Sequence, residues 1–298
     1  MRCTGQTPYL LPVLLLVHTS IAQTLQLPPR STDAPTRDRV IQSISALSRE
    51  SREDSLFRQI MCGNVPDFMR ILAPITSSAS IGETLYSVTY YVTPDYLAVG
   101  SEEKYFLIPM TPLLAQRLAD AVHCTLPTRK MANDIYAAAP LKLAPAPSAP
   151  SAGMIAVPVF ALHDSIVWAQ RSPQLGPFPP GTLVGGTKKD VVISNKIRND
   201  LKTGVPKPVV IYGWHQLNGV PIQPLYNGHG ETYADYSHGI RLVQEAVLLN
   251  GSPTTVSAIL KDTSLSAILS DEGPISFPRY GDPPTGVETK AWYAPRVR

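Results

Sequence analysis

The sequence predicts an α+β fold, with N-terminal helices and a β-hairpin followed by a mainly antiparallel β portion that carries short C-terminal helices. Two patterns favour this class. Apolar residues recur at helical spacing after residue 38, and β-forming residues gather in short runs from residue 85 onward. A third observation is negative, because strands and helices do not alternate regularly as they do in a doubly wound parallel sheet. Thirty prolines in 298 residues add an expectation of many loops and short elements.

The composition is that of a globular protein with no preference for nucleic acid. Hydrophobic residues make up 44% of the chain and charged residues only 16%, which is typical of a chain that buries a core. The formal net charge is +3 and the basic residues form no run, so we expect no nucleic-acid partner.

The first 22 residues have the pattern of an export signal. Arg2 is the only early charge, an apolar run extends from Tyr9 to Val17, and Ser20-Ile21-Ala22 offers small residues for cleavage after Ala22. The run is shorter than the roughly 20 residues that a membrane-spanning helix needs, and no later segment approaches that length. We therefore expect a secreted protein, extracellular or periplasmic, with no stable membrane insertion.

Changes in composition divide the rest of the chain into four parts. Residues 23–37 are polar and rich in proline, and are expected to form a disordered lead-in. A helical lobe with a hairpin is expected over 38–139, a Pro/Ala/Ser linker over 140–153, and a mainly β lobe over 154–298. The candidate site lies in the last part.

Within these parts the periodicity predicts individual elements. Helices are expected over 38–62, over 113–122, from Pro127 through Tyr136, over 256–260 and over 265–269, and strands over 85–92, 96–99, 105–108, 155–162, 166–169, 190–194, 209–213 and 239–243. Asn218-Gly219 predicts a hairpin with a type I′ turn. Residues 274–298 are expected to form a surface tail.

Two cysteines remain after loss of the signal segment. In an oxidising compartment Cys62 and Cys124 are expected to form a disulfide. The alternative is a catalytic thiol, since Cys124 precedes a predicted helix whose N-terminus stabilises a thiolate. A cysteine at a helix start, followed by strands that bring in a histidine, resembles the order of parts in papain-like cell-wall amidases, whose local motif is not found around Cys124. That resemblance implies a thiol hydrolase.

Side chains that can titrate, bind a metal or hold a substrate are most concentrated between Lys207 and Val243. Asp235 lies three residues before His238 in a predicted loop, where a carboxylate can orient an imidazole for general acid–base catalysis. The structural alternative is that Asp235 only closes a turn. Substrate-binding residues are expected around this pair: His215, His229, Arg241, Tyr236, Trp214 and Lys188.

No cofactor is predicted, and zinc is the alternative. His215, His229 and His238, with Asp235 or Glu231, form a ligand set that zinc accepts. No HExxH or other diagnostic spacing accompanies these residues.

The sequence thus predicts a secreted hydrolase with a His/Asp site in 207–243. Its substrate would be an amide, ester or glycan of an extracellular or cell-envelope polymer, or a small molecule. One alternative is a non-catalytic protein that binds carbohydrate or a surface through Trp168, Trp214 and several tyrosines. The other is the papain-like thiol hydrolase that uses Cys124.

Overall fold

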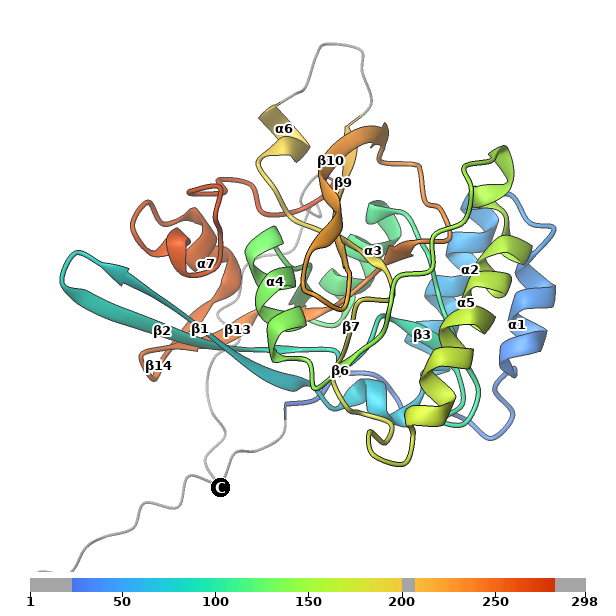
Figure 1. Cartoon of the computed structure of the whole chain (residues 1–298). Coiled ribbons are helices and arrows are strands. Elements are labelled where there is room, and N and C mark those ends of the chain that lie inside the picture. The colour runs from blue at the N-terminus through green and yellow to red at the C-terminus, as the bar shows by residue number, and fades with distance from the viewer. Residues whose placement is uncertain (1–22, 200–206, 282–298) are drawn as a thin grey trace, which may run out of the picture.

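The first half of the chain supplies four helices with hydroxyl N-caps. Figure 1 shows how the helices and strands are arranged. The computed structural model describes residues 23–199 and 207–281, so the expected signal segment and the end of the expected tail lie outside the described residues. Each predicted N-terminal helix is confirmed: α1 (Arg37–Ile44), α2 (Arg49–Met61), α3 (Pro112–Ala121) and α4 (Arg129–Ala138). Thr36, Ser48, Thr111 and Thr128 cap them in that order, each accepting a hydrogen bond from a backbone N–H of the first turn.

The segment before α1 is ordered, which corrects the expected disordered lead-in. Leu25 is buried, and its N–H donates to the carbonyl of Arg70 at 2.8 Å. The Arg30 guanidinium donates to Asn64 Oδ1 at 2.9 Å. Composition alone missed this segment because a few apolar and arginine contacts to distant residues hold it. The short 3₁₀ helix η1 (Asp67–Arg70) supplies part of that surface.

The larger sheet contains strands from both halves of the chain. β1 (Ala73–Ile81) pairs with β2 (Thr84–Val92), and the remaining strands follow the order β14-β13-β2-β12-β5. β5 (Cys124–Thr125) comes from the first half, whereas β12 (Val243–Gln244), β13 (Ala246–Leu249) and β14 (Ser252–Thr255) come from the second. One hydrophobic core extends from Leu25 to Tyr280. Residues of the expected helical lobe and of the expected β lobe thus share one sheet and one core.

The smaller sheet carries four of the predicted site residues, Trp214, His215, His229 and His238. Its order is β10-β9-β8-β11, with β8 (Lys189–Val191), β9 (Pro208–His215), β10 (Pro221–Gly230) and β11 (His238–Gly239). β9 and β10 form the predicted hairpin. Its turn is not type I′, because positive φ falls on Gly219 and not on Asn218, and Gly219 N–H donates to the Gln216 carbonyl at 2.8 Å. The loop is a β-turn followed by a left-handed glycine.

The predicted strands over 155–162 and 166–169 are wrong, because this region is the helix α5 (Val157–Arg171). Its inner face mixes polar and apolar residues: His163 and Asp164, each 3% exposed, lie there with the buried Val157, Phe160 and Val167. Its outer face is apolar, with Leu162 63% and Ile166 43% exposed. Asp164 is held by the Arg37 guanidinium at 2.7 Å and by the Leu107 N–H at 3.0 Å.

Short elements complete the chain. They are β3 (Ala98–Gly100) and β4 (Tyr105–Leu107), which form the predicted hairpin, β6 (Leu141–Lys142), which pairs in parallel with β7 (Val184–Gly185), η2 (Ala152–Ile155), η3 (Ser172–Gln174), α6 (Lys196–Asn199), and the predicted C-terminal helices α7 (Val256–Lys261) and η4 (Leu265–Ile268). The described part of the expected surface tail packs inward, because Ile275 and Tyr280 are buried. These pieces confirm the α+β class.

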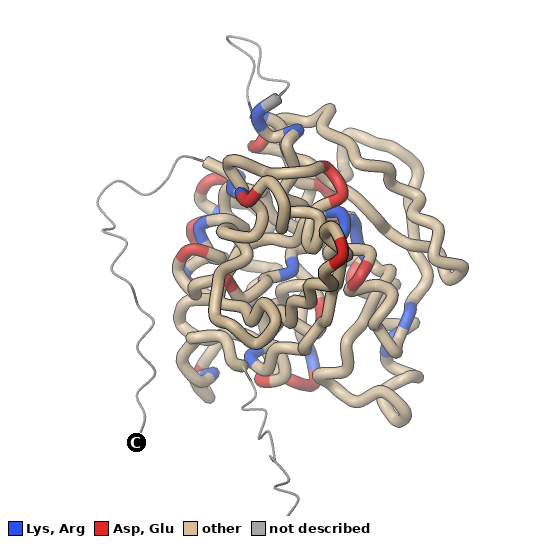
Figure 2. Tube along the Cα trace, turned by 90° about the vertical axis from the view of Figure 1, so that its left-hand side faces the viewer, with Lys and Arg blue, Asp and Glu red and all other residues tan. Residues whose placement is uncertain are grey.

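The described residues contain no helix long and apolar enough to cross a membrane. Basic and acidic residues are interspersed along the trace in Figure 2.

Candidate functional site

The loop before β11 holds an ordered carboxylate. Asp235 Oδ1 accepts hydrogen bonds from the Ser237 N–H at 2.8 Å and from Ser237 Oγ at 2.5 Å. The Tyr233 hydroxyl donates to the other carboxylate oxygen at 3.3 Å. Burial acts to raise the pKa of Asp235, but the His238 charge and the Ser237 hydrogen bonds outweigh it and leave that pKa below its usual value. Asp235 is therefore ionised and fixed in orientation.

His238 is fully buried, and its ring nitrogens have no hydrogen-bond partner among the described residues. Burial lowers the pKa of His238 to about 4, against the opposing attraction of Asp235. The Tyr233 ring meets the imidazole edge-on, with centroids 5.7 Å apart, and stacks on His229 at 4.0 Å. Since Tyr233 and His229 are half-buried, the three rings form a chain of contacts from the interior toward the surface.

Lys188 lies in the interior and not at the surface expected of a substrate-binding residue. It is 1% exposed, and its ammonium donates to the Tyr236 carbonyl at 2.6 Å. Its Nζ also lies 3.1 Å from His163 Nδ1. Burial lowers the pKa of Lys188 to about 8. Burial, together with the Lys188 charge, lowers the pKa of His163 to about 3, so this imidazole is neutral.

His163 is a member of the site that the sequence did not reveal. It contacts Tyr236 and Trp214, with ring centroids 4.9 Å and 6.1 Å away. The region was expected to form strands, which would have separated His163 from the loop at 233–239. The available signal was the helical spacing of Asp164 and Arg171, with His163 beside Asp164, which places three polar groups on one face.

Arg241 has a structural role, because its guanidinium contacts several separate segments of the chain. It is 1% exposed and donates to the carbonyls of Thr93, at 3.1 Å, and Val184. Its guanidinium lies 4.2 Å from the centre of the Tyr96 ring, and its Nε is 3.8 Å from Asp190 Oδ1. Burial raises the pKa of Asp190 to about 6 despite Arg241. These contacts join the residue that follows β2 to β7 and β8, and none reaches the surface.

Trp214 and His215 end β9 but face different neighbours. Trp214 is 3% exposed, and its indole N–H donates to the Thr187 carbonyl at 3.1 Å. His215 Nε2 lies 2.9 Å from Asn133 Oδ1, and the ring stacks on Tyr136 at 4.4 Å. Burial lowers the pKa of His215 to about 4. His215 thus belongs to an α4–β9 contact, whereas Trp214 contacts the His163 and Tyr236 rings.

The two cysteines are free in the structure, where the sequence led us to expect a disulfide. Cys62 is exposed at the C-terminus of α2, and Cys124 is buried in β5, opposite Gln244 of β12. Burial and then the Glu245 charge raise the pKa of Cys124 to about 12, which opposes formation of a thiolate. The cap of α4 is Thr128 and not Cys124. Cys124 therefore lacks the environment of a catalytic nucleophile.

Within the described ranges, no group of three or more His, Cys, Asp or Glu side chains is placed to hold a metal ion. The predicted ligands diverge, since His215 faces Asn133 and His229 stacks on Tyr233.

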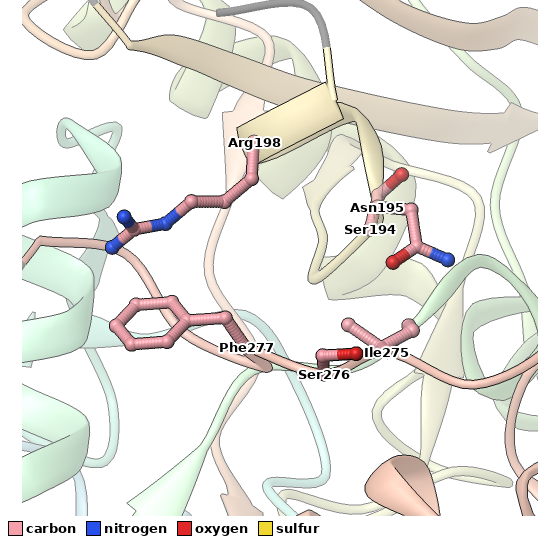
Figure 3. Close-up of a pocket in the computed structure, with 6 residues that line it drawn as sticks. All are labelled: Ser194, Asn195, Arg198, Ile275, Ser276 and Phe277. Carbon is pink, nitrogen blue, oxygen red and sulfur yellow. The ribbon is translucent and has the colours of Figure 1, made fainter. Parts of the chain in front are cut away.

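Two cavities lie near these elements, and no predicted site residue lines either. A cavity of about 190 Å³ is lined by Ser194, Asn195, Arg198, Ile275, Ser276 and Phe277 (Figure 3). There the Arg198 guanidinium lies 3.8 Å from the centre of the Phe277 ring. A second cavity, of about 10 Å³, touches Asp95, Leu143 and Arg171. It has room for about one water molecule beside the inner face of α5.

Comparison of the chain with protein-family models, with curated proteins and with solved structures found no match.

Proposed function

We propose that this protein is a secreted hydrolase, extracellular or periplasmic, that cleaves an amide, ester or glycan bond of an extracellular or cell-envelope polymer. The observation that carries the proposal is the His238 imidazole, which is buried without a hydrogen-bond partner among the described residues and lies next to the ionised Asp235. A buried polar group left unpaired costs stability, about 1–3 kcal/mol, so its presence favours a catalytic purpose. The export pattern of residues 1–22 supports the location.

In this proposal His238 is the general base and then the general acid. Its lowered pKa keeps the ring unprotonated at any pH above about 4, which is the form that accepts a proton from an attacking water. Asp235 stabilises the imidazolium that results, and its hydrogen bonds with Ser237 keep it in place. The imidazolium then returns the proton to the leaving group as the bond to the substrate breaks.

Positive charge next to this pair comes from Lys189. Its side chain is half-buried, its ammonium lies 5.1 Å from the centre of the Trp214 ring, and its charge acts on both Asp235 and His238. Such a charge stabilises the negative oxygen that develops during hydrolysis. Lys189, and not the buried Lys188 that was expected to bind substrate, is therefore the cation of the proposed site. Access to the imidazole requires displacement of Tyr233, the half-buried ring that contacts it.

The test is a comparison of wild-type protein with His238→Gln on a panel of model esters, peptides and oligosaccharides. Glutamine keeps polarity and similar size but cannot take up a proton at neutral pH. We expect loss of hydrolysis by a factor of at least 100, the usual contribution of a general base. His123→Asn is the matched control, because His123 is exposed and has the positive φ that asparagine tolerates. Equal activity of wild type and His238→Gln would refute the proposal.

The two other functions expected from the sequence lose their main support. The Trp214 indole is buried and hydrogen-bonded, so it offers no exposed platform for a sugar ring. The thiol hydrolase needs a thiolate that the surroundings of Cys124 oppose.

A further inference from the structure

The segment between β6 and η2 forms no helix or strand and passes alongside α5 (Figure 1). We call residues 143–151 the strap; their sequence is LAPAPSAPS. Three prolines favour an extended backbone, and the remaining side chains are small apart from the first leucine. Successive contacts to Gln170 and His163 show that the strap runs antiparallel to α5.

Side chains of the body bind the backbone of the strap. The Gln170 amide contacts Ala144 twice, because its Oε1 accepts from the Ala144 N–H at 3.0 Å and its Nε2 donates to the Ala144 carbonyl at 3.2 Å. The Tyr236 hydroxyl accepts from the Ser148 N–H at 2.7 Å. In the part of the chain that the structure describes, hydrogen bonds to the strap all go to its main chain. This pattern matches the way that binding grooves recognise an extended peptide.

The surface under the strap belongs to the candidate site. The Ala146 backbone acts to raise the pKa of the His163 ring, and His163 Nδ1 in turn lies 3.1 Å from Lys188 Nζ. Tyr236, which binds the strap through its hydroxyl, receives the Lys188 hydrogen bond on its carbonyl. Removal of the strap would uncover a row of groups formed by the Gln170 amide, the His163 ring and the Tyr236 hydroxyl.

We propose that the strap occupies a groove that binds the extended main chain of another polypeptide, rich in small residues and proline, and that the strap competes with this ligand. The contacts to the main chain indicate a peptide ligand, because a glycan lacks the paired N–H and C=O that the Gln170 amide contacts in Ala144. The hydroxyl of Tyr236 supplies a second acceptor four residues further along, as an extended peptide requires. Cleavage of the bound peptide rests on the proposed function, whereas the binding itself does not.

The experiment releases the strap without altering the groove. Ala144→Pro with Ser148→Pro removes both donated N–H groups, and proline suits an extended backbone. Ala149→Pro is the control, because no hydrogen bond of the Ala149 N–H is present in the described structure. The probe is a fluorescently labelled synthetic peptide, LAPAPSAPS, measured by anisotropy; a labelled oligosaccharide serves as the competing class.

We expect the double variant to bind the peptide at least tenfold more tightly than wild type, and Ala149→Pro to behave as wild type. Adding Gln170→Ala to the double variant should abolish the gain. Equal affinity in wild type and double variant, or binding that is insensitive to Gln170→Ala, would overturn the inference, as would preference for the oligosaccharide. If circular dichroism shows that the double variant is unfolded, the same measurement is made after proteolysis at a site engineered between Ser148 and Ala149.

Failure of the two proposals can be told apart. Peptide binding with no hydrolysis of any substrate would preserve the groove and refute the hydrolase. If His238→Gln loses hydrolysis but neither strap variant binds the peptide, the hydrolase is supported and the groove is refuted.

Discussion

His238→Leu is expected to stabilise the protein while it removes activity. The wild-type imidazole is fully buried, and its two nitrogens have no partner within the described residues. A buried polar group without a hydrogen bond costs about 1–3 kcal/mol, and leucine fills a similar volume without polar atoms. Because leucine does not match the shape of the imidazole, part of this gain is lost, and we expect the free energy of unfolding to rise by about 1 kcal/mol at pH 7. For a domain of roughly this size, that rise corresponds to about 2–4 °C in Tm.

The gain should increase at lower pH, because the folded-state pKa of His238, about 4, is below the ordinary histidine pKa of 6.5. Between these values the unfolded wild-type chain binds a proton that the folded protein does not. Protonation of the unfolded chain therefore lowers the free energy of unfolding of the wild-type protein as the pH falls from about 6.5 toward 4. Above about pH 6.5 this loss is absent. For this single group the loss between pH 7 and pH 5 is about 2 kcal/mol, and the leucine variant escapes it.

Urea denaturation at pH 7 and pH 5 measures both quantities, with unchanged m-values required for a valid comparison. His215→Leu is the matched control: its ring has a similar pKa shift, but its Nε2 is paired with Asn133 and the ring stacks on Tyr136. The control should lose stability at pH 7. A loss of more than 1 kcal/mol in His238→Leu, or a gain that does not change with pH, would show that the imidazole is a structural group.

Three further outcomes are expected. Alkylation of the native protein should modify Cys62 alone, and alkylation after unfolding should modify Cys62 and Cys124; a chain with no free thiols under both conditions would restore the disulfide. Gly239→Ala should destabilise the fold by about 1–3 kcal/mol or more in thermal unfolding, because the new Cβ would lie 2.4 Å from the Tyr96 ring and 2.6 Å from Lys188 Cβ; wild-type stability would contradict that packing. Arg241→Lys should cost about 2–4 kcal/mol, since lysine cannot reproduce the two carbonyl contacts and the stacking on Tyr96, and a loss below 1 kcal/mol would argue against a structural role.

Local patterns predicted much of the fold. The capped N-terminal helices, the β9–β10 hairpin and the α+β class follow from spacing, caps and turn residues close together in sequence. β1 was missed because Ser77, Ser78 and Ala79 give no apolar alternation, and pairing with β2 makes the strand. α5 was taken for strands because Leu162 and Ile166 face outward while His163 and Asp164 face inward.

The site was predictable only where its members are neighbours in the chain. Asp235, Ser237 and His238 share one loop, so the sequence identified them directly. Lys188, Trp214 and Tyr236 do meet in one cluster, but their burial was not visible in the sequence. His163 and Gln170 join the cluster through the position of α5, which depends on contacts more than a hundred residues apart, such as Arg37 with Asp164.

The position of β2 in the larger sheet has a consequence for how the chain reaches its native state. Residues 88–92 of β2 pair with residues 243–249, which are made only after more than 150 further residues have been synthesised. Contacts so distant in sequence carry a high contact order, which slows folding. Until they form, one edge of the β1–β2 hairpin has unpaired backbone groups, and such an edge can pair with a second molecule. Loss of the last strands should therefore yield an aggregating chain and not a stable N-terminal fragment.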